Sequence, residues 1–240
     1  MTTVLDVAHL RYFYDHAVDA LADVSLSLSD SSIVGLIGPN GSGKSTLIKN
    51  VFDLLRAQTG SITVNGHEHA TTQAKSEAMY LASNDYLPEF LTGREYVELL
   101  ARMYGLDVDP GQMRDLFARY SMAGRFDDLI ENYSHGMRKK TQLVAALLMR
   151  RPLLVVDETL NGMDLEALHL CEADLRQLRA AGHTVLLCTH DFALLERLAD
   201  RVLFLDLGQV VFDQPTDDLV ADGGSLAGLV FDHLESEHRP

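Results

Sequence analysis

Residues 38–46 carry the clearest chemical pattern in the chain. They read Gly-Pro-Asn-Gly-Ser-Gly-Lys-Ser-Thr and fit the phosphate-binding pattern G-x-x-x-x-G-K-[ST] without a mismatch. Glycines let such a loop adopt positive φ and wrap its N–H groups around phosphate oxygens. Lys44 is then expected to reach the β- and γ-phosphates, and Ser45 to bind a magnesium ion. The candidate phosphate-binding residues are Gly38, Pro39, Asn40, Gly41, Ser42, Gly43, Lys44, Ser45 and Thr46.

Two acidic residues follow an apolar run further along the chain. The run Leu-Leu-Val-Val at 153–156 precedes Asp157 and Glu158. A continuous apolar run is typical of a strand buried on both faces, and ligands bind at the carboxyl ends of parallel strands. Asp157 is therefore predicted to bind magnesium, and Glu158 to be the general base for an attacking water. The alternative is that each acid only caps the next turn.

A second apolar run, 184–188, leads to His190 in the same way. If both strands belong to one parallel sheet with the strand before residue 38, their polar ends meet at one edge. His190 is therefore predicted to belong to the catalytic site with Lys44 and Glu158.

Tyr14 is the candidate for contact with a nucleotide base. It lies in an aromatic segment, Tyr-Phe-Tyr at 12–14, shortly before the phosphate loop. A base stacked on such a ring gains about 1–3 kcal/mol by analogy with other base–aromatic pairs. The alternative is that these rings pack a sheet edge.

The elements around these residues indicate an α/β fold. Apolar runs at 33–37, 153–156 and 184–188 predict a mainly parallel sheet, with helices at 47–55 and 166–179 between the strands. Alternating apolar and polar residues at 4–10 and 24–28 predict an antiparallel sheet, and Asn65-Gly66 predicts a tight hairpin turn. A closing hairpin is expected around Leu207-Gly208.

Between the strand candidate 79–82 and residue 153, the pattern changes to helices. Thr92 and Glu95 form a predicted capping box before a helix to about residue 104, and further helices are expected at 110–119 and 136–149. We therefore expect a single domain over 1–240, with a core lobe at about 1–83 and 151–240 and a helical lobe at about 84–150.

Composition limits the partners. The formal net charge is -15, which argues against binding of nucleic acid or anionic lipid through clustered basic residues. No apolar run is long enough to span a bilayer, and the first residues lack the pattern of a signal peptide. We expect a cytoplasmic protein without direct lipid insertion, whose Cys171 and Cys188 are buried rather than paired.

The order of these motifs resembles the nucleotide-binding subunit of ATP-binding cassette (ABC) transporters, in an exporter-like subgroup. The matching segments, in chain order, are 38–46, 133–137 (Tyr-Ser-His-Gly-Met) at the signature, 157–158, 161–164 (Asn-Gly-Met-Asp) at the interface loop, and His190 as the switch histidine. The resemblance implies a P-loop NTPase core with ATP and Mg²⁺ as ligands. It also implies a head-to-tail dimer in which Ser134 and Gly136 contact the γ-phosphate of the ATP bound by the partner subunit.

The chain departs from the family pattern at several positions. Ser83 stands where the family usually has a glutamine that meets magnesium and water, so Ser83 is the candidate at that metal position. Thr159 stands where many members have proline, and His135 and Met137 replace the commoner Gly and Gln of the signature. The residues expected to do the chemistry are intact.

The resemblance thus implies an ATP-hydrolysing subunit that drives a separate membrane permease of export type. It would pair as a homodimer or heterodimer and lie on the inner face of the cell membrane through the permease. The alternative is a soluble cassette ATPase that acts in DNA maintenance, translation or iron–sulfur assembly. Duplicated cassettes, long coiled coils or basic surfaces would mark the first two of these functions, and the chain has none of them.

Overall fold

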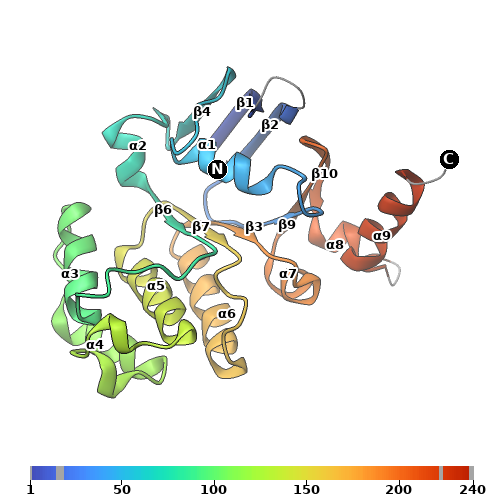
Figure 1. The fold of residues 1–240 in the computed structure, drawn as a ribbon. Coiled ribbons are helices and arrows are strands. Elements are labelled where there is room, and N and C mark those ends of the chain that lie inside the picture. Colours follow the sequence, from blue (N-terminus) through green and yellow to red (C-terminus); the bar gives the residue numbers. More distant parts are fainter. Residues whose placement is uncertain (1, 15–18, 222–223, 238–240) are drawn as a thin grey trace.

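A six-stranded sheet forms the centre of the computed structural model, which describes residues 2–14, 19–221 and 224–237 (Figure 1). Its strand order is β10-β9-β3-β8-β7-β6, and all neighbours are parallel except β10 and β9. The strands are β3 (Ile33–Ile37), β6 (Ala78–Leu81), β7 (Leu153–Asp157), β8 (Thr184–Cys188), β9 (Arg201–Asp206) and β10 (Gln209–Pro215). The mainly parallel sheet predicted from the apolar runs is confirmed.

A second, antiparallel sheet lies above the first, with the order β2-β1-β4-β5 (Figure 1). Its strands are β1 (Thr3–Phe13), β2 (Asp19–Ser29), β4 (Thr59–Val64) and β5 (His67–Glu68). The Asn65-Gly66 turn between β4 and β5 has φ of 49° and 79°, as a tight hairpin turn requires. The N-terminal antiparallel sheet is therefore also confirmed.

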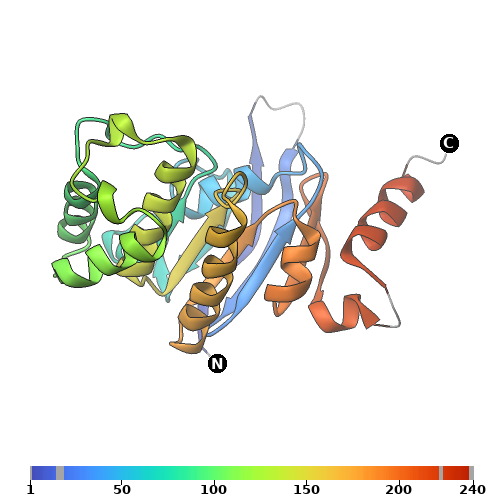
Figure 2. The same cartoon turned by 90° about the horizontal axis from the view of Figure 1, so that it is seen from below.

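Helices cover both faces of the central sheet. Helix α1 (Lys44–Val51) lies between the two sheets, while α5 (His135–Met149), α6 (Leu165–Ala180) and α7 (Phe192–Leu198) cover the opposite face (Figures 1 and 2). Alternate residues of each central strand belong to two separate apolar clusters. In β3, for example, Ile33 and Ile37 pack toward α5, α6 and α7, whereas Leu36 packs toward α1 and the second sheet. Burial on both faces explains the uninterrupted apolar runs in these strands.

The segment between β6 and β7 is helical. It contains α3 (Gly93–Met103), α4 (Pro110–Arg119), two short 3₁₀ helices at Ala123–Arg125 and Ile130–Asn132, and α5. Thr92 and Glu95 form the predicted capping box at the start of α3. Tyr120 and Arg119 tie this segment to α6, since both donate hydrogen bonds to buried Asp174, at 2.7 and 2.8 Å. The division of the chain into two lobes stays a prediction.

Several element bounds differ from the sequence prediction. Helix α1 begins at Lys44 and ends at Val51, so the predicted range 47–55 is wrong at both ends. The helix ends early because Asp53 adopts a left-handed conformation with φ of 55° and pairs with Lys75. Strands β1 and β2 are longer than predicted, since their edges continue to pair beyond the alternating core positions.

Four helices were not predicted: α2 (Thr72–Glu77), α7, α8 (Thr216–Leu219) and α9 (Leu226–Glu237). Figure 2 shows α9 at one end of the molecule, beyond β10 and far from the helical segment. Both cysteines are buried and unpaired, as expected.

Candidate nucleotide-binding site

The phosphate loop connects the carboxyl end of β3 to the first turn of α1. Gly43 caps α1 with φ of 107°, and Gly41 has φ of 84°. A Cβ added to Gly41 would project into open space, whereas one added to Gly38 would lie 2.0 Å from the carbonyl oxygen of Leu205. The loop therefore needs glycine at 38 for close packing and leaves the backbone open at 41, where phosphate oxygens can approach.

Lys44 is buried beneath this loop. Its Nζ atom donates hydrogen bonds to the carbonyl oxygens of Gly38 and Pro39, at 2.7 and 3.0 Å. These bonds hold the ammonium group inside the curve of the loop. A cation in that position, next to the N-terminus of a helix, suits the phosphates of a nucleotide.

A pocket of about 550 Å³ opens above the loop. Its lining residues are Tyr14, Asp19, Ala20, Asn40, Gly41, Ser42, Gly43, Lys44, Ser45, Thr46 and Glu158. The Tyr14 side chain is 59% exposed, and its hydroxyl lies 3.1 Å from Oγ1 of Thr46. The structure thus puts the predicted base contact, most of the phosphate loop and the predicted general base around one cavity.

Two lining residues, Asp19 and Ala20, were missed in the sequence. Both belong to the start of β2, which is brought to the pocket by its pairing with β1. Asp19 accepts hydrogen bonds from the guanidinium of Arg11, the shortest at 2.7 Å. No local motif marks these residues, because their place depends on irregular strand register between Leu10 and Phe13.

Asp157 ends β7 and is almost fully buried. Its Oδ2 accepts a hydrogen bond of 3.0 Å from the hydroxyl of Tyr80. Burial raises the pKa of Asp157 above its ordinary value, while hydrogen bonds from Tyr80 and Cys188 oppose that rise. At this strand end Asp157 offers carboxyl oxygens, the ligand type that a hard divalent cation prefers.

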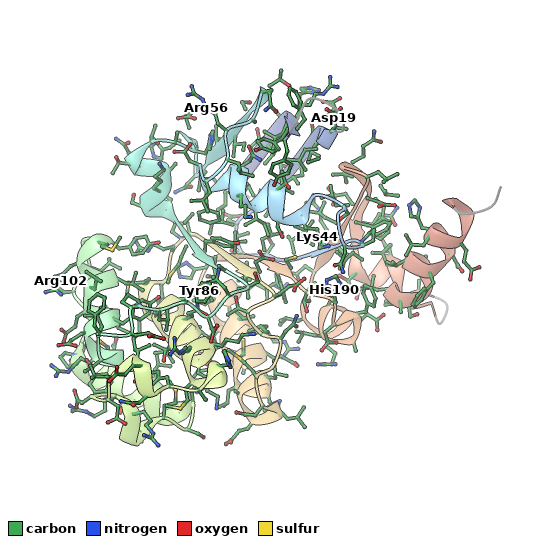
Figure 3. All side chains as sticks on the ribbon, in the orientation of Figure 1. Asp19, Lys44, Arg56, Tyr86, Arg102 and His190 are labelled. Carbon is green, nitrogen blue, oxygen red and sulfur yellow. The ribbon has the colours of Figure 1, made fainter. Side chains whose placement is uncertain are left out.

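Glu158 and His190 are in direct contact. Oε1 of Glu158 lies 2.9 Å from Nε2 of His190. Glu158 has φ of 52°, and its backbone N–H donates to the carbonyl oxygen of Cys188 at 2.9 Å, which turns the chain away from the strand. Figure 3 labels His190 after β8 and Lys44 on α1, facing the same part of the molecule. Strands β3, β8 and β7 are neighbours, so the three predicted catalytic residues come from adjacent strand ends.

The oxygen donors present fit magnesium. Ser45 offers an exposed hydroxyl and Asp157 a carboxylate, and magnesium bound to a nucleotide needs only one or two protein oxygens besides phosphate and water. Within the described part of the chain, no group of three or more His, Cys, Asp or Glu residues could hold a metal by itself. The site therefore suits a metal ion that enters with the nucleotide.

Seven predicted residues do not line this pocket: Gly38 and Pro39 of the loop, Asp157 and His190 at the neighbouring strand ends, and Ser83, Ser134 and Gly136. Ser83 is exposed just after β6, next to the strand that ends at Asp157. Ser134 caps α5 by accepting a 3.3 Å hydrogen bond from the backbone of Met137, and a Cβ added to Gly136 would meet no atom within 4 Å. Ser134 and Gly136 thus present a hydroxyl and open backbone at the start of a helix, separate from the pocket of their own subunit. Their contact with a second ATP stays a prediction.

Comparison with known proteins agrees with this geometry. A family model described as "ABC transporter" matches residues 21–161. "Daunorubicin resistance ATP-binding protein DrrA3" of Streptomyces coeruleorubidus is 32% identical over 92% of this chain and 70% of its own length. "ABC-type transporter ATP-binding protein EcsA" of Bacillus subtilis (strain 168) is 34% identical over 79% of this chain and 78% of its own length.

A solved structure described as "Structure of ATP binding subunit of ABC transporter" has a TM-score of 0.88 and 30% identity, and the match covers 97% of this chain and 99% of that one. None of the described helices is long and apolar enough to cross a membrane. With the phosphate loop and Glu158 around one pocket, and His190 in contact with Glu158, the chain belongs to the ABC transporter family, as an ATP-binding ATPase subunit.

Proposed function

We propose that this chain hydrolyses ATP in the pocket between Tyr14 and Glu158. The observation that supports this most directly is that Glu158 lines the same cavity as the phosphate loop while it contacts His190. Tyr14 stacks on the adenine, and Lys44 with the loop backbone holds the phosphates. Glu158 accepts a proton from the attacking water, and His190 orients the Glu158 carboxylate.

Mg²⁺ supplies charge neutralisation at the phosphates when it is bound. Ser45 and Asp157 are the residues that would hold it, and Ser83, after the neighbouring strand β6, would add its hydroxyl. ATPase activity of the purified chain, measured with and without magnesium, tests this assignment. Loss of turnover in the Lys44→Ala variant supports the site, and unchanged turnover in that variant refutes it.

We further propose that two ATPase subunits pair head to tail, as a homodimer or heterodimer. Ser134 and Gly136 are accessible at the start of α5 yet lie outside the pocket of their own subunit. A second chain can therefore offer its bound γ-phosphate to the Ser134 hydroxyl and the open helix N-terminus. The pairing predicts that Ser134→Arg leaves ATP binding by the monomer intact and abolishes the ATP-dependent dimer.

The partner of the dimer is a separate membrane permease, which holds the subunits at the inner face of the membrane. An exposed apolar patch in the segment between β6 and β7 fits this partner. It consists of Tyr86, Phe90 and Leu129, which are 84%, 79% and 38% exposed. Leu129 pairs with Thr92 in an isolated bridge, and the backbone N–H of Glu131 donates to the carbonyl oxygen of Glu89, so Leu129 lies beside the segment that carries Phe90. Exposed aromatic residues of this size mark surfaces for protein partners.

Copurification tests the permease proposal. A tagged chain expressed in its own cells and extracted from membranes with detergent should retain a polypeptide with membrane-spanning helices. Phe90→Ser should lose that polypeptide but keep the ATPase activity of the isolated chain. Leu54→Ser removes an apolar side chain that is 60% exposed elsewhere and is the matched control. Equal loss in both variants would contradict a contact at the patch.

We propose export as the direction of transport, because relatives of this chain are named for daunorubicin resistance.

A further inference from the structure

Ser83 comes two residues after the end of β6, the strand that pairs with β7 at the edge of the central sheet. Strands β6 and β7 are parallel, and Leu81 is paired with Val156. Beyond that pair the hydroxyl of Thr159, the residue after Glu158, bonds to the carbonyl oxygen of Ala82, so Ser83 follows directly on a residue that contacts the turn carrying Glu158. A serine hydroxyl is short, so its usefulness at this position depends on how firmly the backbone around it is held.

Thr159 holds the backbone on one side of Ser83. Its side chain is fully buried, and Oγ1 lies 3.0 Å from the carbonyl oxygen of Leu81 and 3.1 Å from that of Ala82. The carbonyl oxygen of Asp157 is a third acceptor, at 3.3 Å, and the hydroxyl shares its single hydrogen among the three. Because Thr159 directly follows Glu158, this contact fastens the end of β6 to the turn that carries the predicted general base.

Gln142 holds the backbone on the other side. From α5, its Nε2 donates to the carbonyl oxygen of Asn84 at 3.2 Å. The side chain is buried, and its Oε1 has no hydrogen-bond partner among the described residues. A buried amide oxygen without a partner lowers stability, so an apolar residue would serve the fold of α5 better. The hydrogen bond to Asn84 gives a reason for glutamine at this position.

We propose that Thr159 and Gln142 are positioning residues that fix Ser83 next to Glu158. They hold the carbonyl groups at 81, 82 and 84, on both sides of Ser83, from two different elements. The backbone on both sides of Ser83 is thus held by side-chain hydrogen bonds, from the turn after β7 and from α5. The inference rests on the proposed ATPase site and adds the residues that keep one member of it in place.

Hydrogen exchange of the nucleotide-free chain tests the structural half of the proposal. Thr159→Val and Gln142→Met remove the two contacts with little change in volume. Each should speed amide exchange in residues 82–91 by about three- to tenfold, the effect of one hydrogen bond. Thr141→Val is the matched control, since it removes a buried hydroxyl on α5 whose single bond within the described ranges goes to the carbonyl oxygen of Met137, at 2.9 Å. Unchanged exchange in 82–91 for both test variants would overturn the proposal.

A double-mutant cycle tests the link to Ser83. Thr159→Val and Ser83→Ala should each lower kcat for ATP by about five- to tenfold, with KM nearly unchanged, and the double variant should be no slower than Ser83→Ala alone. Multiplied effects in the double variant would show that Thr159 does not act through Ser83 and would overturn the proposal. If the parent chain hydrolyses no ATP, the proposed function fails, and the exchange experiment still decides whether Thr159 and Gln142 hold the loop.

Discussion

Replacing Glu158 with glutamine separates the chemistry of this site from its shape. Glutamine has nearly the same size, and its side-chain oxygen or nitrogen can keep the 2.9 Å contact with His190. The left-handed backbone at 158, with φ of 52°, strains both residues equally. Lys44 and the phosphate loop are untouched, so affinity for ATP should change by no more than about twofold. What the variant lacks is a group that accepts a proton from water.

Positioned proton transfer contributes about 10²- to 10⁴-fold to a rate, which corresponds to about 3–5 kcal/mol of activation free energy. Phosphate release under saturating ATP and magnesium should therefore slow by that factor in Glu158→Gln. The slow variant should also accumulate as an ATP-bound dimer, which light scattering detects as a doubling of mass. Glu98→Gln, at a partly exposed side chain of α3 outside the nucleotide pocket, is the control and should match the parent.

Two results would refute this reasoning in different ways. Hydrolysis by Glu158→Gln at the parent rate would mean that Glu158 is not the base and that the strand end of β7 is wrongly assigned. Slow hydrolysis with at least tenfold weaker ATP binding would mean that Glu158 holds the nucleotide rather than the attacking water.

Further predictions concern the metal, the link between α4 and α6, and pH. Asp157→Asn should raise the magnesium concentration needed for half-maximal turnover by about tenfold or more, and the variant should remain mainly monomeric with ATP. Equal magnesium dependence in the variant and the parent would contradict the assignment of Asp157 to the metal. Tyr120→Phe removes the 2.7 Å hydrogen bond to buried Asp174 and should lower the free energy of unfolding by about 1–3 kcal/mol, measured by urea denaturation. If the free energy of unfolding does not change, this bond does not stabilise the helical segment. Burial lowers the pKa of His183, so the folded chain binds a proton at this residue more weakly than the unfolded chain does. The stability that neutral His183 contributes is therefore complete above about pH 6.5 and is lost as pH falls through the folded-state pKa. The parent should therefore lose more stability than His183→Gln between about pH 7.5 and 5.5 in urea melts, and parallel losses would contradict this.

The sequence predicts this site well where chemistry and strand ends coincide. Asp157 and His190 follow uninterrupted apolar runs, and such runs leave few alternatives to a buried parallel strand. The phosphate loop is equally clear, because its glycine spacing reflects local backbone conformations.

The rest depends on contacts that no local pattern encodes. Asp19 reaches the pocket through an irregular register between β1 and β2. The end of α1 depends on the conformation of Asp53 and its pairing with Lys75, 22 residues later. The roles of Ser134 and Gly136 depend on a second chain, so neither the sequence nor one subunit alone can test them.

The position of β3 in the sheet affects how this protein is made. Its two neighbours are β8 and β9, with Ile33 paired to Val185 and Val34 to Arg201. The strand that leads into the phosphate loop therefore cannot pair with either neighbour until residues 184–206 have been synthesised. Such distant pairings make folding slow and leave apolar strands exposed during synthesis. During translation the antiparallel sheet of β1, β2 and β4 can form early, but the nucleotide cannot help the chain to fold until the segment around β8 and β9 arrives.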